Sequence, residues 1–482
     1  MQLLIMLPYM GIVLMILGVS MALPIFWGIY FNESEWVMFL LSSIITFSVG
    51  LIMNKATTRF KEDLRQRQAL ILVTLTWIVA SVFSTIPYLL TKTFDTFTDA
   101  FFESMAGFTT TGASVIPDLE VLSYTVLFWR SLTHWLGGMG IIILFIAIMS
   151  TLKMGGTQLF RAEIPGSVVQ KLKPRISQTA LILWSTYVIL TFVLTAILWA
   201  LGMSIFDAIN HAFGTMATAG CSTKNASLGY YNDPGIYWAV TIFMFLAGSN
   251  FALYFVALKE KSLLHFWKNA EFRLYTKIVV LFTFMMTTNL LFIENKSIAD
   301  ALTLSSFKVI SSITTTGFTI YDYQGWTAFP QTIIIVLLFV GGCNGSTSGS
   351  IKVGRYLIMF KQCIVELQQA VHPRAIINLK LDGKQINDQL IINVLTYFFL
   401  YIFLISMGTL FLTFLGLDLL SAFTAVLGSI SNGGIGLTQL ASGQFFTVFP
   451  TLGKHILALL MLLGRLEIYT VLILFSPSFW RK

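Results

Sequence analysis

The sequence predicts an all-α polytopic membrane protein of four fused repeats, preceded by two extra N-terminal transmembrane helices. Three observations lead to this fold class. Hydrophobic residues make up 56% of the 482 residues, whereas charged residues make up only 11%. A short string of small residues around a glycine occurs four times, each time between two apolar runs. Lysine and arginine gather in loops that would lie on one side of a membrane.

The composition is far from that of soluble proteins, in which about 25% of residues are charged. Long apolar runs take up most of the chain and leave no room for a separate soluble domain outside the loops. The three cysteines, Cys221, Cys343 and Cys363, form neither a CxxC pair nor a disulfide framework. The net charge of +8 could suggest a nucleic-acid partner, but the basic residues are distributed as in membrane proteins. We therefore expect contact with membrane lipids and no nucleic-acid partner.

Two apolar runs at the start of the chain, at about residues 3–30 and 36–53, predict the extra helices. Each is near the ~20 residues that a bilayer requires. No small-residue cleavage site follows the first run in the right place, so we expect no removed signal peptide.

Four units of one plan follow: a long helix, a short helix of about half a membrane thickness, a glycine string and a second long helix. The first long helices are expected from about Ala69, Thr179, Tyr275 and Gln389, and the second from about Leu122, Ile236, Phe329 and Leu452. This plan gives ten full spans and four half-spans. The expected domains are an N-terminal two-helix domain at 1–67 and repeats at 68–176, 177–272, 273–387 and 388–482.

Each short helix is expected to begin at an aspartate, because aspartate is favoured at helix N-caps. The four aspartates are Asp99, Asp207, Asp300 and Asp418. The C-terminus of such a helix points a partial negative charge at the glycine string, which favours a cation there. Glu103 lies four residues after Asp99, and we interpret the two as a cap and a surface acid rather than as a catalytic pair.

The four strings read FTTTGAS, MATAGCS, ITTTGFT and, in a degenerate form, ISNGGIG. A row of backbone carbonyl oxygens facing an axis can replace the water shell of a monovalent cation. Glycine permits the conformations that such a row needs, and threonine hydroxyls brace it by local hydrogen bonds. Small residues in membrane helices usually mark helix packing, but four copies in register favour an ion filter. The expected filter residues are Thr110, Thr111, Gly112, Thr218, Ala219, Gly220, Thr315, Thr316, Gly317, Asn432, Gly433 and Gly434.

The charge distribution predicts the orientation in the membrane. Most of the 30 lysine and arginine residues fall in loops that are cytoplasmic if the N-terminus lies inside. The positive-inside rule therefore predicts cytoplasmic N- and C-termini. Acidic residues prevail in the opposite loops, among them Glu33, Glu35, Asp118 and Asp233. Such a surface raises the cation concentration at a pore mouth, although acids also cap helices and solvate loops.

Several motifs resemble the TrkH family, the membrane subunits of bacterial Trk potassium uptake systems. They are DAFFES at 99–104, WLGGMGI at 135–141, RAEIPG at 161–166, GGCNGST at 341–347, GRLEI at 464–468 and PSFW at 477–480. The resemblance covers almost the whole chain and implies a pseudo-fourfold pore of fused potassium-channel-like units in the bacterial inner membrane. It also implies potassium as the transported ion, no organic cofactor, a homodimer, and regulation by a TrkA-like cytosolic nucleotide-binding ring.

The chain departs from the family pattern at four positions. Ala219 stands in the second string where a threonine is expected, and Ile435 follows the fourth glycine where the family often has proline. Asn344 and Ser348 replace smaller residues. These differences bear on the sharpness of selectivity and on gating.

The apolar run after the third string is interrupted at 341–349. The resemblance favours a gate beneath the filter over a flexible kink. Arg465 brings a charge into an apolar helix, which costs ~2.5–3.5 kcal/mol at mid-bilayer unless the charge faces protein or water. The resemblance favours a place below the filter, where the arginine would repel the cation; the alternative is an ion pair with Glu467 or another acid. The expected gate residues are Gly341, Gly342, Cys343, Asn344, Gly345, Ser346, Thr347, Ser348, Gly349 and Arg465.

Three other functions are weighed against potassium transport. A sodium-preferring or sodium-dependent transporter of the same superfamily usually has serine at the first filter glycine, where this chain has Gly112. A secondary transporter with broken helices should contain inverted repeats, whereas these four all start and end on one side. An enzyme would need a convergent acid, base or nucleophile, and no such motif is visible. His134 and His211 lack partners at metal-ligand spacing, so we expect satisfied, buried histidines.

Overall fold

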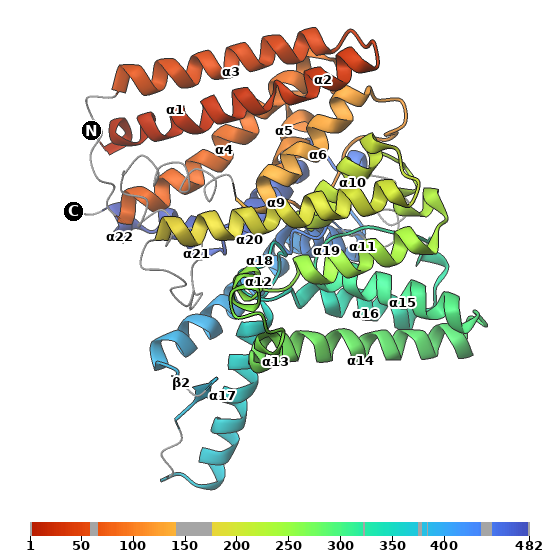
Figure 1. Cartoon of the computed structure of the whole chain (residues 1–482). Helices are drawn as coiled ribbons and strands as arrows, with labels where there is room; N and C mark the ends of the chain where they lie inside the picture. The colour runs from red at the N-terminus through yellow and green to blue at the C-terminus, as the bar shows by residue number, and fades with distance from the viewer. Residues whose placement is uncertain are drawn as a thin grey trace.

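The computed structural model describes residues 2–57, 66–140, 176–321, 323–374, 378–382, 384–434 and 446–480. Most of these residues are helical, and the all-α fold class is confirmed (Figure 1). The only strands in the described ranges are β1 Lys380–Leu381 and β2 Lys384–Gln385, which pair in an antiparallel hairpin.

The two N-terminal spans are confirmed. They consist of α1 Gln2–Ser20 with α2 Leu23–Tyr30, and of α3 Trp36–Thr57. Glycines let α1 and α3 approach closely, because a Cβ atom at Gly11 would lie only 2.6 Å from the carbonyl oxygen of Gly50. Small residues at such contacts are typical of helix packing in membranes.

The predicted order of elements is confirmed in each of the four units. The first long helices are α4 Gln66–Leu90, α9 Ile176–Ala200, α14 Ala270–Phe292 and α18 Asp388–Phe414. The short helices are α5 Phe97–Phe108, α10 Ile205–Met216, α15 Ile298–Ile313 and α19 Leu419–Ile430. The second helices are α6 Tyr124–Gly138, α11 Pro234–Ala247, α16 Ala328–Phe339 and α20 Thr451–Arg465. The domain boundaries drawn from this plan stay predictions.

The second helices of units two and four differ from the expected continuous spans because they break. α11 is followed by α12 Phe251–Lys259 at a bend of 91°, and α20 by the segment Tyr469–Phe475 at a bend of 112°. α16 leads into a loop and then into α17 Val353–Val371. The described residues contain six helices long and apolar enough to cross a membrane, or up to eight if each bent pair is one span. The prediction of unbroken second spans is therefore wrong for the second and fourth units, whereas the interruption predicted at 341–349 in the third unit is confirmed. Residues 141–175, which follow the first unit's second helix, lie outside the described residues.

The remaining short elements connect or follow these helices. They are α13 Leu264–Lys268, α21 Tyr469–Leu472, α22 Pro477–Trp480, and the 3₁₀ turns η2 Ser227–Tyr231, η3 Tyr323–Gly325, η5 Phe446–Val448 and η6 Ile473–Phe475.

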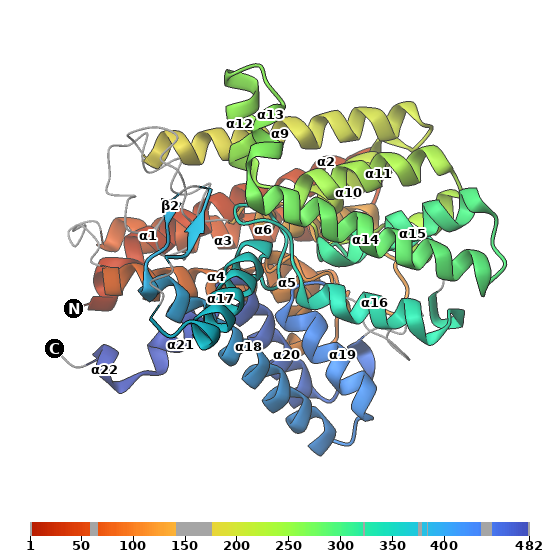
Figure 2. The same cartoon turned by 90° about the horizontal axis from the view of Figure 1, so that it is seen from below.

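The four units form a closed ring. Within each unit the short helix packs against both the first and the second helix. Between units, α6 contacts α10, α11 contacts α15, α16 contacts α19, and α20 contacts α5. The last contact joins the end of the chain to its first unit. In Figure 2 the colours follow this order around the molecule, and the blue last unit lies beside the orange first one.

The short helices begin three residues earlier than expected in three of the four units. Their N-caps are Thr96, Ser204 and Ser297, whose hydroxyls accept the backbone N–H of Asp99, Asp207 and Asp300. Each aspartate in turn accepts a hydrogen bond from the hydroxyl, at 2.7 to 2.9 Å. These three aspartates are therefore the third helical residue and bond to the N-cap hydroxyl, and of the four aspartates only Asp418 is itself the N-cap of its short helix.

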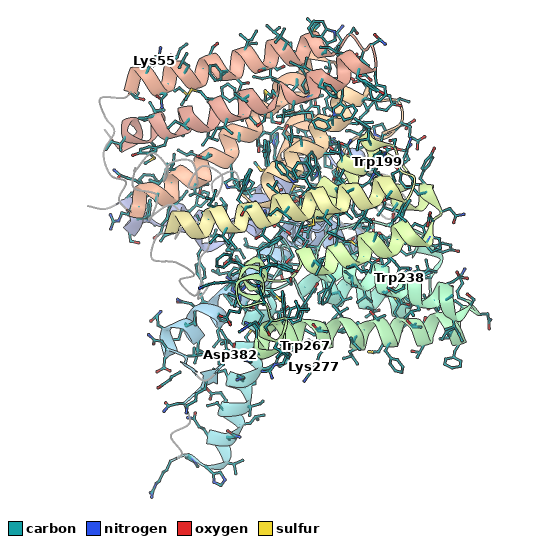
Figure 3. The ribbon with its side chains drawn as sticks, viewed as in Figure 1. Lys55, Trp199, Trp238, Trp267, Lys277 and Asp382 are labelled. Carbon is teal, nitrogen blue, oxygen red and sulfur yellow. The ribbon has the colours of Figure 1, made fainter. Side chains whose placement is uncertain are left out.

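The two ends of the bundle differ in character (Figure 3). Lys55 lies at the end where α1 begins and α22 ends, whereas Trp199 and Trp238 lie towards the opposite end. Exposed tryptophans are typical of membrane–water interfaces, and Trp199 is 62% exposed. The assignment of the first end to the cytoplasm stays a prediction. α17 and the β1–β2 hairpin project from the bundle (Figure 1).

Candidate functional site

The four predicted filter strings share one backbone shape. The residue two positions before the filter glycine has a positive φ in every string: 55° at Thr110, 52° at Thr218, 56° at Thr315 and 52° at Asn432. The glycines have φ values of 73°, 65°, 90° and 56°. Positive φ is uncommon outside glycine, and such residues cluster at functional sites. The degenerate fourth string thus follows the others up to Gly434, and residues 435–436 lie outside the described ranges.

The strings meet around the ring through their carbonyl oxygens. A Cβ atom added to a filter glycine would collide with the carbonyl oxygen before the glycine of a neighbouring string. The colliding pairs are Gly112 with Ala219, Gly220 with Thr316, and Gly434 with Thr111. The filter glycines are partly exposed, whereas the residue before each is buried. Carbonyl oxygens of neighbouring units therefore come together where the glycines leave an opening, which suits a dehydrated monovalent cation.

Side-chain hydrogen bonds brace three of the strings. Thr109 Oγ1 lies 2.8 Å from Thr111 Oγ1, and the equivalent hydroxyls of the third string lie 2.7 Å apart. Asn432 Nδ2 donates to Thr111 Oγ1 at 3.1 Å and ties the fourth string to the first. The second string has Ala217 and Ala219 at the two braced positions, so it lacks this hydroxyl pair.

The predicted gate loop, residues 341–349, lies directly against the filter. The backbone N–H of Gly349 donates to Thr315 Oγ1 at 2.7 Å. Thr347 Oγ1 donates to the carbonyl oxygen of Met216, the last residue of α10, at 3.0 Å. Both ends of the loop are buried, and Gly345 at its tip is exposed. The interruption is thus an ordered loop that touches two units of the ring.

Arg465 at the end of α20 joins the first string, the loop and α6. Its Nη1 donates to Thr110 Oγ1 at 3.1 Å and to the Thr347 carbonyl oxygen at 2.9 Å. Its Nη2 donates to the carbonyl oxygens of Gly137 and Gly138, at 2.5 and 2.7 Å. The alternative partner Glu467 instead forms an ion pair with Arg355. The guanidinium therefore lies between filter and loop.

A carboxylate that the sequence did not single out holds the loop from below. Glu271 Oε1 in the first turn of α14 accepts the backbone N–H of Asn344 at 2.6 Å and of Gly354 at 2.9 Å. Lys352 Nζ donates to the carbonyl oxygen of Ser348. The signal for Glu271 in the sequence is slight, because an acid in a first helical turn is also favoured by the helix dipole alone.

Glu103 was wrongly interpreted as a surface acid. It is 2% exposed, and its Oε1 lies 2.7 Å from Nε of Arg130, which is 3% exposed. The sequence did carry one indication of a buried partner, because Arg130 stands in an apolar run.

The two histidines are buried, as expected. Nδ1 of His134 lies 2.8 Å from the Arg130 carbonyl oxygen, and Nδ1 of His211 lies 2.8 Å from that of Asp207. His211 Nε2 also lies 3.0 Å from Ser222 Oγ, whereas His134 Nε2 has no hydrogen-bond partner among the described residues. The expectation of a satisfied histidine is met only by His211. In the described part of the chain no three His, Cys, Asp or Glu side chains are grouped to hold a metal ion.

Acidic and amide side chains join the loops that follow the first two strings. Asp118 Oδ1 accepts hydrogen bonds from Asn225 Nδ2 at 2.7 Å and from the Glu120 backbone N–H at 2.9 Å. The bond from Asn225, followed by that from Glu120, lowers the pKa of Asp118. Asp118 therefore keeps its negative charge at this end of the strings.

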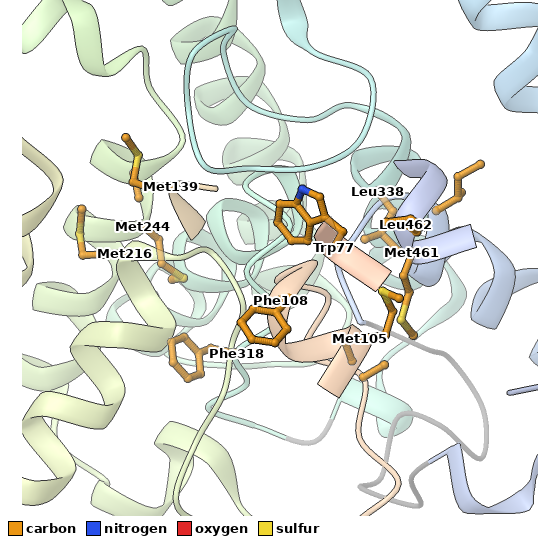
Figure 4. Close-up of a cluster of buried hydrophobic side chains, with 14 of the residues drawn as sticks. Trp77, Met105, Phe108, Met139, Met216, Met244, Phe318, Leu338, Met461 and Leu462 are labelled. Atoms are coloured by element: carbon orange, nitrogen blue, oxygen red, sulfur yellow. The ribbon is translucent and has the colours of Figure 1, made fainter. Parts of the chain in front are cut away.

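Large apolar side chains surround the inner ends of the short helices (Figure 4). Phe108, Met216 and Phe318 come from the first three strings or their helices, and Met461 comes from α20. Trp77 of α4 lies among them, with its ring centroid 6.0 Å from the Arg465 guanidinium carbon. This packing excludes water around the strings and holds their unusual backbone in place.

Comparison with known proteins agrees with this geometry. The family model TrkH, described as a cation transport protein, matches residues 37–482. The chain is 37% identical over 479 residues to the Trk system potassium uptake protein TrkH of Escherichia coli (strain K12), covering 98% of each chain. It is 33% identical to the Trk system potassium uptake protein TrkG of the same strain, covering 98% of this chain and 97% of TrkG. The crystal structure of the potassium transporter TrkH from Vibrio parahaemolyticus superimposes with a TM-score of 0.90 at 34% identity over 100% of both chains. The chain therefore belongs to the TrkH family of cation transport proteins.

Proposed function

We propose that this chain moves potassium across the bacterial inner membrane along the axis of its four filter strings. The observation that carries this proposal is the close contact of three filter glycines, Gly112, Gly220 and Gly434, with carbonyl oxygens of neighbouring strings. The relatives named as potassium uptake proteins support potassium as the ion. The chain acts as a transporter and not as an enzyme, and potassium is its cargo rather than a cofactor.

The loop at 341–349 and Arg465 form the gate in this proposal. A cation that has passed the filter next meets the guanidinium, which is bonded to Thr110 above and Thr347 below. Like charges repel strongly where water is excluded, so arginine opposes passage until the loop moves. Its hydrogen bond to the Thr347 carbonyl oxygen keeps the loop in the blocking position, and the other three hydrogen bonds fix the guanidinium to the first string and to α6.

Assembly and orientation belong to the same proposal. The family supports a homodimer and a TrkA-like cytosolic nucleotide-binding ring that moves the gate. The basic loops and the shared position of α1 and α22 at one end support cytoplasmic termini.

Ion flux into liposomes that contain the purified protein tests the function. We expect uptake of rubidium, as a potassium tracer, to exceed uptake of sodium, with empty liposomes as the control. Equal or greater sodium uptake would contradict the proposal and favour the sodium-preferring alternative. The same measurement under an imposed proton gradient shows whether protons are coupled to transport.

A further inference from the structure

A fully buried ion pair lies behind the first two filter strings. Glu103 of α5 and Arg130 of α6 are 2% and 3% exposed, and the Oε1 and Nε atoms lie 2.7 Å apart. Charges buried in this way are costly unless every polar atom near them is hydrogen-bonded. The other hydrogen bonds of Glu103 and Arg130 therefore show which parts of the chain the ion pair positions.

The carboxylate holds the chain as it leaves the first filter string. Ser114 Oγ lies 3.0 Å from both oxygens of Glu103, and the backbone N–H of Val115 donates to Oε2 at 3.0 Å. Ser114 is the second residue after Gly112. The position of Glu103 thus fixes where the first string ends.

The guanidinium holds the equivalent place in the second string. Arg130 Nη1 donates to the Ser222 carbonyl oxygen at 3.1 Å and lies 3.0 Å from Cys221 Sγ. Ser222 is the second residue after Gly220. One arginine therefore joins the carboxylate behind the first string to the backbone of the second.

The four units differ at the position that Glu103 occupies. Nine residues before the filter glycine stand Glu103, His211, Lys308 and Ala425 in turn. His211 bonds to Ser222 as Glu103 bonds to Ser114, whereas Lys308 Nζ lies 3.6 Å from the Tyr323 ring centroid and has no hydrogen-bond partner among the described residues. Ala425 offers no polar group. Among these four positions, only that of Glu103 thus takes part in an ion pair that links one string to the next.

We infer that Glu103 and Arg130 are positioning residues that set the spacing of the first two filter strings and thereby the preference for potassium over sodium. This inference rests on the proposed function. Ion preference depends on the size and field of the carbonyl cage. The second string needs such external support because alanines replace the hydroxyl pair that braces the first and third.

The substitution Arg130→Lys tests the inference. Lysine keeps a positive charge for Glu103, but one ammonium group cannot also reach Cys221 and Ser222. The expected result is a fall of about tenfold in the ratio of rubidium to sodium uptake, equivalent to about 1.4 kcal/mol, with membrane insertion and melting temperature close to the parent. Ser114→Ala, which removes the hydroxyl donor to Glu103, should lower the ratio in the same direction by less.

Asp99→Asn is the matched control. Asp99 forms another ion pair of α5, with Lys454, at the end of the helix away from the filter. Removing its charge should leave the ratio of rubidium to sodium uptake unchanged. A parental uptake ratio in well-inserted Arg130→Lys and Ser114→Ala proteins would overturn the inference. If Arg130→Lys does not insert, a parental ratio in Ser114→Ala alone would overturn it. A parent that does not prefer rubidium to sodium would overturn the proposed function and, with it, the inference.

Discussion

At the scale of single residues, the filter glycines leave no room for a side chain. Replacing Gly112 with serine should lower the preference for potassium over sodium, because the Cβ atom would displace the Ala219 carbonyl oxygen. The φ of 73° also strains any side chain, by about 1–3 kcal/mol. The ratio of rubidium to sodium uptake in liposomes measures this change.

Gly325→Ser is the control for this substitution, because a Cβ atom there would meet nothing within 4 Å. A parental ratio in Gly112→Ser would show that these strings are not the filter. Serine at Gly220 or Gly317 should act similarly. The fourth string is degenerate in sequence, but the φ of 56° at Gly434 and its contact with Thr111 lead us to expect the same effect there.

Arg465 offers a second test at this scale. Arg465→Ala should raise cation flux per inserted protein, because it removes both the positive charge and the bonds to Thr110 and Thr347. Arg465→Lys keeps the charge and should retain much of the block. A well-folded Arg465→Ala protein with parental flux would contradict the barrier, and a poorly inserted one would indicate a structural role instead.

At the scale of elements, the gate loop depends on its anchor on α14. Glu271→Ala should raise flux, because the backbone N–H groups of Asn344 and Gly354 lose their shared acceptor. Removing residues 345–349 should also raise flux, since it removes the obstruction itself. Flux per inserted protein is again the measurement.

Glu260→Ala is the control for Glu271→Ala, since Glu260 is half exposed and pairs with His265 away from the loop. If Glu271→Ala and the shortened loop both insert well and show unchanged or lower flux, the loop is a structural kink and not a gate.

The apolar runs predicted where each helix lies and showed the break at 341–349, but not the breaks that follow α11 and α20. Hydropathy continues across Gly248 and Asn250, so the bend of 91° between α11 and α12 left no trace in the apolar pattern. The N-caps were misplaced for a related reason. Aspartate is favoured both at the N-cap and in the first turn. The sequence alone therefore did not show that the N-cap of α10 is Ser204 and not Asp207.

At the scale of the whole molecule, the repeats in the sequence predicted the four strings, but the sequence did not predict which residues of other units contact each string. Four copies of one string indicated a shared axis, and the structure gives Thr110 and Asn432 the same backbone shape despite their different side chains. The neighbours of each string come from other units, as Arg130 shows by bonding to Ser222. A repeat pattern does not show which units are neighbours, so the contacts between units could be identified only in the structure.

The junction between the last unit and the first gives a further prediction. Lys454 Nζ of α20 lies 2.5 Å from Asp99 Oδ1 of α5, and both side chains are partly exposed. Asp99→Asn should lower the free energy of unfolding by only about 1 kcal/mol or less, because water screens such pairs. Denaturant unfolding of the purified protein measures the change.

The double variant Asp99→Asn with Lys454→Met should lose no more than the sum of the two single variants. A loss of several kcal/mol from Asp99→Asn alone would mean that this one pair, rather than the apolar contact of α20 with α5, holds the ring closed.

The contact between α20 and α5 also has a consequence for the time during which the chain is made. A ribosome completes α5 and its string long before it reaches α20, more than 330 residues later. Until the last unit is made, the first string lacks one neighbour, because the fourth string that contacts it at Gly434 has not been synthesised. Arg465, which bonds to Thr110 of the first string, is also still missing. The last unit thus supplies both the fourth string and the arginine. Under the proposed function, a chain that stops before this unit would have neither a closed filter nor its barrier, and we expect it to form an open-sided bundle rather than a potassium-selective leak.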